Sequence, residues 1–182
     1  MNAESISGSV MGRLFIRLLA RAMESRFRYR FFGPEKILRG VDDLSGRAVL
    51  ELGCGTGFFT LPAARLIGDQ GHLVAMDILE GSVALVSGKV KAAGLRNVQV
   101  VKGDAMATGL EGGSFAVVLL FGVIPAPMLP LSRVLPEVHR LLRPGGNLAV
   151  WPAIPGLSRS VRKSGLFTLG DKRNGVLNLK RR

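Results

Sequence analysis

The sequence predicts an α/β fold with a doubly wound, mostly parallel sheet of seven strands that ends in an antiparallel hairpin. Short apolar runs alternate with segments of helical periodicity from residue 49 to residue 151. Glycine or proline ends most of the helical segments. An Asn174-Gly175 pair stands between the last two apolar segments, and this pair favours a tight hairpin turn. Alternation at this spacing is typical of a parallel sheet with helices on both faces.

The individual elements follow from apolar periodicity. Apolar residues at i, i+3 and i+4 predict a helix over residues 9–30, and Gly33-Pro34 ends it and begins a short helix over 34–39. Strands are predicted at 49–52, 72–76, 98–101, 115–121 and 147–151, and helices at 58–67, 80–93 and 131–142. The segments 166–169 and 176–179 form the antiparallel pair. Together these elements describe a Rossmann-like sheet.

Composition indicates a globular chain without structural metal or disulfides. The 182 residues are about one domain of core material, and 47% are hydrophobic, which excludes a disordered chain. We divide the chain into an N-terminal helical lid at 1–44 and a ligand-binding domain at 45–182. Cys54 is the only cysteine, so a disulfide framework and a cysteine-built zinc site are excluded. Two histidines offer little for another metal site, and no metal is expected.

The net charge of +12 comes from the two ends of the chain. Residues 156–182 hold eight basic side chains and one acidic side chain, whereas residues 49–155 are nearly neutral. Such a field attracts phosphates, anionic lipids or acidic small molecules without choosing among them. The sequence shows no targeting segment, and its longest apolar run, 115–131, contains one glycine and three prolines. We therefore expect no spanning helix and a cytoplasmic location.

A glycine-rich turn between the first strand and its helix carries the most functional information. Glu51 precedes Gly53, Gly55 and Gly57 at alternate positions. Glycine permits a sharp turn and the close approach of a ligand, and the helix that follows presents free N–H groups. A dinucleotide site would need a small residue at the position of Phe58. The spacing therefore argues against a dinucleotide.

This Glu-x-Gly-x-Gly-x-Gly arrangement resembles the first motif of the class I S-adenosylmethionine-dependent methyltransferases. The resemblance continues with Asp77 at the end of the second strand, Asp104 after the third, and Pro144-Gly145-Gly146 before the fifth. It covers residues 45–152 and is broadly similar to the small-molecule group that includes quinone-biosynthesis methyltransferases. The Asn/Asp-Pro-Pro-Tyr signature of many DNA and protein-amide N-methyltransferases is absent.

The resemblance implies S-adenosyl-L-methionine as the cofactor and assigns binding roles. In such a protein Asp77 accepts hydrogen bonds from both ribose hydroxyls, and Ile78 offers an apolar face to the adenine. Asp104 and the backbone N–H of Ala105 read the adenine edge, and Glu51 orders the loop and the methionine amino end. The remaining expected contacts lie in the glycine loop and at the end of the fourth strand: Gly53, Cys54, Gly55, Gly57 and Phe121.

Each of these residues also has a purely structural interpretation. The alternative for Asp77 is to cap a helix, for Asp104 to close a turn, and for Glu51 to cap nearby backbone, and we favour the binding role for each. Cys54 could be interpreted as a catalytic nucleophile. A nucleophilic cysteine is usually activated by a histidine, however, and no histidine lies near Cys54 in the sequence. Since the cofactor carries the reactive group, no catalytic residue is assigned.

The sequence therefore predicts a methyltransferase that acts on a small or medium-sized acceptor, either anionic or lipophilic. The alternatives are an RNA methyltransferase, a non-catalytic cofactor-binding partner subunit, and a basic module at a membrane surface. An RNA substrate agrees with the basic ends but not with the lack of an RNA-binding domain. Arginines interleaved with aromatic residues at 26–32 form either a lid or a docking segment. Membrane contact through residues 9–30 and a homodimer are left open.

Overall fold

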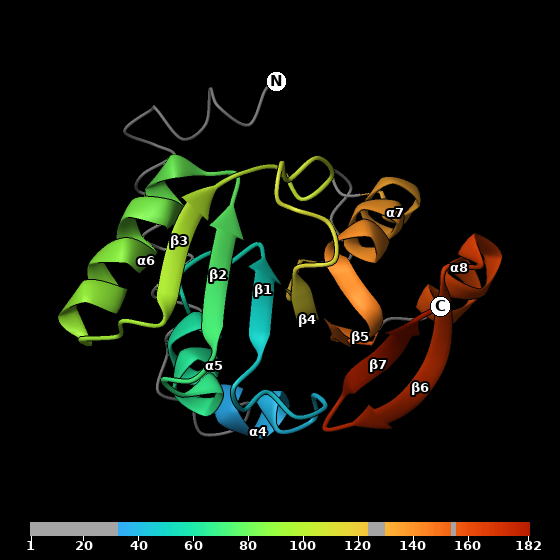
Figure 1. Cartoon of the computed structure of the whole chain (residues 1–182), viewed down its shortest axis with the longest axis horizontal. Coiled ribbons are helices and arrows are strands. Elements are labelled where there is room, and N and C mark those ends of the chain that lie inside the picture. The colour runs from blue at the N-terminus through green and yellow to red at the C-terminus, as the bar shows by residue number, and fades with distance from the viewer. Residues whose placement is uncertain (1–32, 124–129, 154–155) are drawn as a thin grey trace.

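The structure, a computed structural model, describes residues 33–123, 130–153 and 156–182. Its centre is a seven-stranded sheet with the strand order β3-β2-β1-β4-β5-β7-β6 (Figure 1). The strands are β1 (Ala48–Leu52), β2 (His72–Asp77), β3 (Val98–Lys102), β4 (Phe115–Phe121), β5 (Leu142–Trp151), β6 (Phe167–Arg173) and β7 (Val176–Arg181). The first five strands are parallel, and β7 is antiparallel to both β5 and β6. The predicted fold is confirmed.

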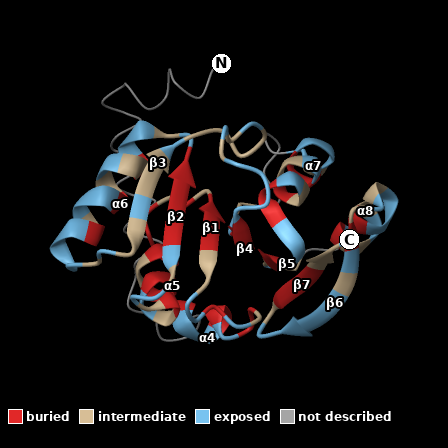
Figure 2. Ribbon diagram, viewed as in Figure 1, coloured by how far each residue is buried: buried red, intermediate tan, exposed pale blue. Residues whose placement is uncertain are grey.

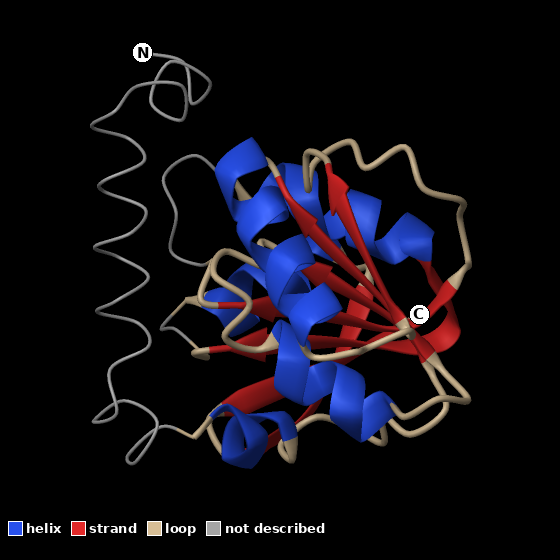
Figure 3. Ribbon diagram, turned by 90° about the vertical axis from the view of Figure 1, so that its left-hand side faces the viewer, coloured by secondary structure: helices blue, strands red, loops and turns tan. Residues whose placement is uncertain are grey.

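Five helices of the described residues accompany the sheet, and they lie on both sides of it (Figure 3). They are α4 (Pro34–Leu38), α5 (Thr60–Ile67), α6 (Glu80–Ala92), α7 (Leu131–Leu141) and α8 (Leu157–Ser164). Because successive strand residues point to opposite faces, Leu50 and Val118 pack with α7 and α8, whereas Val49 and Val117 pack with α4 and α5. The core therefore forms two layers, one on each face of the sheet.

The central strands are the most deeply buried part of the molecule. Every residue of β4 is buried, whereas most of β6 at the sheet edge is exposed (Figure 2). A parallel strand that is covered on both faces needs a continuous apolar sequence, and Phe-Ala-Val-Val-Leu-Leu-Phe in β4 is such a sequence. The exposed edge carries Asp171, Lys172 and Arg173, and charges there discourage pairing with other chains.

Several bounds differ from the prediction, β6 for example reaching Arg173 instead of ending at 169, and the differences at β5 and α8 are the most informative. β5 begins at Leu142, five residues early, because the pairing of β4 with β5 shifts register between Phe115 and Val117 and the intervening residues bulge. Helix α8 was not predicted at all. Only Leu157 and Val161 are apolar and buried on this helix, and the rest of its sequence is polar. A single apolar pair is too weak a periodic signal for a helix.

The C-terminal hairpin has the predicted turn. Both Asn174 (φ 50°) and Gly175 (φ 79°) adopt positive φ, as a two-residue hairpin turn requires. The Asn174 side chain also donates to the carbonyl oxygen of Lys36, at 2.8 Å. The hairpin is therefore tied to α4, which lies far from it in sequence.

The described part of the N-terminal region packs on the sheet. Ile37, Leu38, Val41 and Leu44 are buried in the cluster that contains α5. The helix predicted at 9–30 and the aromatic residues at 29–32 lie outside the described residues, so the lid at 1–44 stays a prediction. No helix in the described ranges has the length and apolarity to cross a membrane.

We expect the β4 core to dominate stability. Leu120 is fully buried in β4, so Leu120→Ala removes apolar contacts and leaves a cavity. The free energy of unfolding should fall by about 2–5 kcal/mol in urea titrations followed by circular dichroism. Gln99→Ala on the exposed face of β3 is the control and should change it by less than about 0.5 kcal/mol. A loss below about 1 kcal/mol for Leu120→Ala would contradict the packing described above.

Candidate functional site

The glycine-rich loop after β1 is anchored on the end of β2. The backbone N–H groups of Gly53 and Cys54 both donate to the carbonyl oxygen of Met76, at 2.8 and 3.0 Å. The N–H of Gly55 donates to Asp77 Oδ2 at 2.8 Å. β1 and β2 are paired in parallel with Leu52 opposite Met76, so their carboxyl ends meet at one edge of the sheet. The strand pairing thus brings the two predicted motifs together.

The loop turns its backbone toward open space. Gly53, Gly55 and Gly57 all have positive φ, which a side chain would strain. A Cβ built on Gly55 would meet no atom within 4 Å, whereas one on Gly53 would lie 3.0 Å from the methyl groups of Val123. The loop therefore packs against Val123 on one side and leaves room for a ligand at Gly55.

Asp77 closes a turn just ahead of α6 but does not cap that helix, whose N-cap residue is Leu79, and its ribose role stays a prediction. Its Oδ1 accepts from the N–H of Leu79, at 2.9 Å, at the start of α6, and its Oδ2 accepts from Gly55. Asp77 is 8% exposed. A carboxylate accepts about four hydrogen bonds, so two sites remain for the hydroxyl groups of a ligand. Next to it, Ile78 is 48% exposed, and within the described ranges it is the only large apolar residue that is exposed.

Glu51 lies beneath the loop in a fully buried position. Thr60 Oγ1 donates to Glu51 Oε2 at 2.6 Å, and both residues are inaccessible to solvent. Burial, and to a smaller extent the charge of Asp77, raise the pKa of Glu51 to about 7, although the hydrogen bond from Thr60 lowers it. Glu51 therefore gains and loses its proton near neutral pH, and an ammonium group placed beside it would favour the ionised form.

Asp104 lies at the same edge and closes a local turn. Its Oδ1 accepts from the N–H of Met106 at 2.8 Å. The preceding residue, Gly103, donates its N–H to the carbonyl oxygen of Asp77 at 3.0 Å, which links the ends of β3 and β2. Ala105 follows in the same turn and packs against the core. The structure thus contains the turn role of Asp104, and the adenine contact of Asp104 and Ala105 stays a prediction.

Cys54 and Phe121 are buried rather than presented to a ligand. Burial raises the pKa of the Cys54 thiol, and the nearby carboxylates of Glu51 and Asp77 raise it further. A thiol that stays protonated is a poor nucleophile, so any contact of Cys54 with a ligand is expected from its backbone. The ring of Phe121 packs edge-on against Phe59, with 5.0 Å between centroids. Any contact that Phe121 makes with a ligand must also come from its backbone.

Two supporting residues had no signal in the sequence. Lys89 Nζ, on α6, donates to the carbonyl oxygen of Thr56 at 2.9 Å and so holds the loop from the side. Thr60 is the buried partner of Glu51. The hydroxyl of Thr56 is buried and has no hydrogen-bond partner in the part of the chain that the structure describes. Such a group is expected to gain a partner from a ligand or a water molecule.

The two histidines lie away from this edge. His72 begins β2 at its amino end, and its ring lies 6.5 Å from that of Phe115. His139, on α7, packs edge-on against Phe167. Over residues 33–123, 130–153 and 156–182, no three histidine, cysteine or acidic side chains are grouped as metal ligands would be.

Comparison with known proteins agrees with the methyltransferase family that the sequence motifs predict. Residues 49–146, more than half of the chain, match the family model described as methyltransferase domain. Among curated proteins, the demethylmenaquinone methyltransferase of Lactococcus lactis is 33% identical over 114 residues, which are 62% of this chain and 44% of that protein. The demethylmenaquinone methyltransferase of Listeria welshimeri is 37% identical over 116 residues, 61% and 48% of the respective chains. The chain thus spans about half the length of these relatives.

Solved structures share the fold. A SAM-dependent methyltransferase from Aquifex aeolicus superposes with a TM-score of 0.77 at 22% identity, over 93% of this chain and 97% of that one. The [4+2]-cyclase SpnF superposes with a TM-score of 0.65, also at 22% identity, over 76% and 57%. At this identity the likeness concerns the fold alone, and the cyclase illustrates that one fold hosts different reactions.

We expect Glu51→Gln to stabilise the protein at alkaline pH. Because the folded chain binds the Glu51 proton more tightly than the unfolded chain (ordinary pKa 4.5), the stability from this proton is complete below pH 4.5. It is lost as the pH rises through about 7. At pH 8 the neutral amide should therefore raise the free energy of unfolding by about 1–3 kcal/mol, with little change at pH 4.5. Urea titrations at both pH values measure this, and equal effects at the two would contradict it.

Proposed function

Since this chain belongs to the class I S-adenosylmethionine-dependent methyltransferase family, we propose that it transfers a methyl group from S-adenosylmethionine to a small, lipophilic, quinone-like acceptor. The observation that carries the proposal is the glycine loop whose open backbone is bonded to the Asp77 carboxylate. It combines close approach to backbone with a carboxylate that has free acceptor sites. These are the two features that a nucleoside ligand needs.

The residues at this edge fit the cofactor of the family. We assign the ribose hydroxyls to Asp77, the adenine face to Ile78, and the adenine edge to Asp104 and Ala105. The open backbone at Gly55 and the unpartnered Thr56 hydroxyl lie in the loop that would run along the bound molecule. Glu51, buried below the same loop, is assigned to ordering the methionine end. These roles rest on the geometry of the described residues together with the family motifs.

When bound, S-adenosylmethionine supplies a methyl group on a positively charged sulfur, which a nucleophilic atom of the acceptor takes directly. The chain's own residues bind and orient the reactants. Asp77 places a carboxylate beneath the loop, and Glu51 adds negative charge there when it is ionised, which a cationic ligand would favour. Cys54 is a protonated thiol, and His72 and His139 lie elsewhere. We assign no general base, and the proton of the acceptor passes to solvent.

The class of acceptor is inferred from relatives. Both proteins compared above are named demethylmenaquinone methyltransferases, and they are 33% and 37% identical to this chain. The name specifies a quinone acceptor. Because this chain spans about half of their length, the quinone class is our proposal and the remaining acceptor contacts are not assigned.

Asp77→Ala should weaken the binding of S-adenosylhomocysteine. The substitution removes the acceptors for the ribose and also the bond that holds Gly55. The loss should be about 1–3 kcal/mol, which is about 5- to 150-fold in Kd by isothermal calorimetry. The control is Glu80→Ala, which removes an exposed carboxylate three residues further along, paired with Lys102. Equal affinity of the folded Asp77→Ala protein and the wild type would refute the role of Asp77.

Transfer of labelled methyl groups tests the acceptor class. With S-adenosylmethionine labelled in the methyl group, we expect incorporation into a reduced naphthoquinone that carries a short isoprenoid chain. The same assay contains bulk RNA as a second acceptor. Methylation of RNA alone would overturn the quinone class. Tight cofactor binding without transfer to any acceptor would favour a non-catalytic partner subunit instead.

A further inference from the structure

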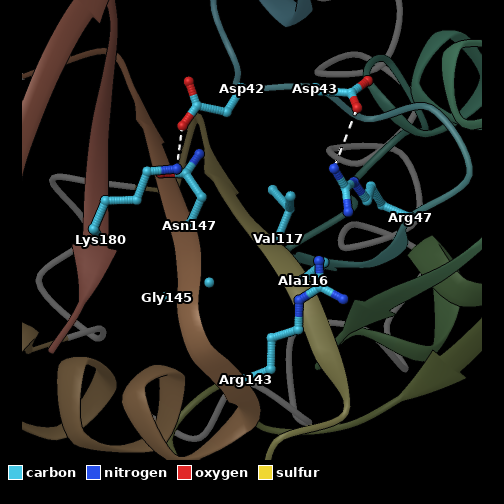
Figure 4. A pocket seen from close by; sticks show the side chains of 10 residues that line it. Asp42, Asp43, Arg47, Ala116, Val117, Arg143, Gly145, Asn147 and Lys180 are labelled. Carbon is cyan, nitrogen blue, oxygen red and sulfur yellow. Dashed lines mark hydrogen bonds and ion pairs between the residues drawn. The ribbon is translucent and has the colours of Figure 1, made fainter.

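A hollow lies at the amino ends of the parallel strands, opposite the end that carries the glycine loop. Its volume is about 140 Å³, room for several water molecules or one small anion. It is bounded by the loop before β1 and by the amino-terminal parts of β4 and β5, together with β7 (Figure 4). The residues that the argument uses are Asp42, Arg47, Ala116, Arg143, Asn147 and Lys180. None of them belongs to the candidate cofactor site.

The hollow has an excess of positive charge. Three cations line it, Arg47, Arg143 and Lys180, together with two carboxylates, Asp42 and Asp43. Both carboxylates are already engaged: Arg47 lies 3.3 Å from Asp43, and Lys180 and Arg173 both pair with Asp42. Burial alone would raise the pKa of Asp42, but Lys180 and Arg173 outweigh it and lower that pKa below its usual value. Asp42 therefore remains an anion.

Arg143 is the cation that remains uncompensated. It has no ion-pair partner within the described ranges, and its exposed side chain extends toward Ala116 at the hollow (Figure 4). Ala116 lines the hollow at the register shift between β4 and β5, and its small side chain also packs in the buried apolar cluster that contains Val117. A guanidinium offers several N–H donors in a plane and is suited to oxyanions. The positive charge of Arg143 thus favours an anionic ligand in the hollow.

Asn147 adds a requirement for a hydrogen-bond donor in whatever occupies the hollow. It is 2% exposed, and its Oδ1 has no hydrogen-bond partner among the described residues. Its orientation is set by Asn178, whose Nδ2 donates to the carbonyl oxygen of Gly40 and to Asp171 Oδ1, two groups that only accept. Asn178 must therefore present Oδ1 to Asn147, and Asn147 donates Nδ2 to it at 2.9 Å. The free Oδ1 of Asn147 consequently needs a donor from elsewhere.

We propose that this hollow binds a small oxyanion that carries at least one O–H group, for which monohydrogen phosphate is the simplest example. Its negative oxygens would face Arg143. Its O–H would donate to Asn147 Oδ1 after a small shift of the Asn147 side chain, because that atom is closed to solvent in the structure. An oxyanion without a proton, such as sulfate, can satisfy the guanidinium but not the amide oxygen. Selectivity for a protonated oxyanion is therefore the property that distinguishes this site from a merely cationic surface.

The site would join parts of the chain that are far apart in sequence. Arg143 and Asn147 belong to β5, while Asn178 and Lys180 belong to β7. Asn178 is bonded in turn to Gly40, in the segment before β1. A bound oxyanion should therefore stabilise the folded chain by mass action without touching the cofactor site.

The test compares phosphate with sulfate at equal ionic strength. At about ten times its Kd, phosphate should raise the Tm of the wild type by about 3–6 °C more than sulfate does. Non-specific salting effects give sulfate at least as large a shift as phosphate. Equal shifts with the two anions would therefore overturn the proposal. Calorimetry with inorganic phosphate gives the Kd directly.

Three variants test whether phosphate binds in this hollow. Arg143→Met should weaken phosphate binding by about 10-fold or more, because a charged hydrogen-bond donor is lost. Ala116→Asp places a carboxylate in the hollow and should abolish the response to phosphate. Arg133→Met removes an exposed arginine on α7 and is the matched control, with an unchanged Kd. If Ala116→Asp fails to fold, Arg143→Met decides. A phosphate affinity that Arg143→Met leaves unaltered would refute the site, and binding of S-adenosylhomocysteine should be normal in all three.

Discussion

The hydrogen bond between the Gly55 N–H and Asp77 Oδ2 is the constraint on which the candidate site depends. A loop rich in glycine has no side chains with which to hold itself, and its conformational entropy opposes a single shape. Here the shape is imposed by the neighbouring strand, through the carbonyl oxygen of Met76 and the carboxylate of Asp77. The pairing of β1 with β2 therefore determines the position of the loop, and the carboxylate that we assign to the ligand is also the one that holds the loop.

Glu51 illustrates the conflict between stability and binding at such a site. An ionisable group with no exposure to solvent is unfavourable in its charged form, and the hydrogen bond from Thr60 offsets only part of the cost. A hydrophobic residue of similar size would suit the fold better. The carboxyl group is explained if a cationic end of a ligand lies above it. Destabilising residues of this kind are common where a protein binds its ligand.

Much of the fold could be predicted from the sequence because strand and helix periods are local. The continuous apolar sequence of β4 and the hairpin turn at Asn174-Gly175 are two features that were predicted in this way. Features that depend on distant partners could not be predicted. Lys89 and Thr56 meet across 33 residues, and no periodic pattern encodes that contact. Helix α8 was missed because only Leu157 and Val161 mark its buried face. The hollow at Arg143 was missed for the same reason, since the Asn147–Asn178 bond joins two separate strands.

The place of β7 in the sheet has a consequence for biosynthesis. This strand lies between β5 and β6 and contacts both, yet it follows them in the chain. While the ribosome is still adding residues 176–181, the edge of β5 that will pair with β7 is open, and this edge includes the buried residues Leu148 and Val150. Open apolar edges promote association between nascent chains. Translation that pauses just before these codons would prolong this vulnerable state, so their decoding speed should influence how much native protein a cell obtains.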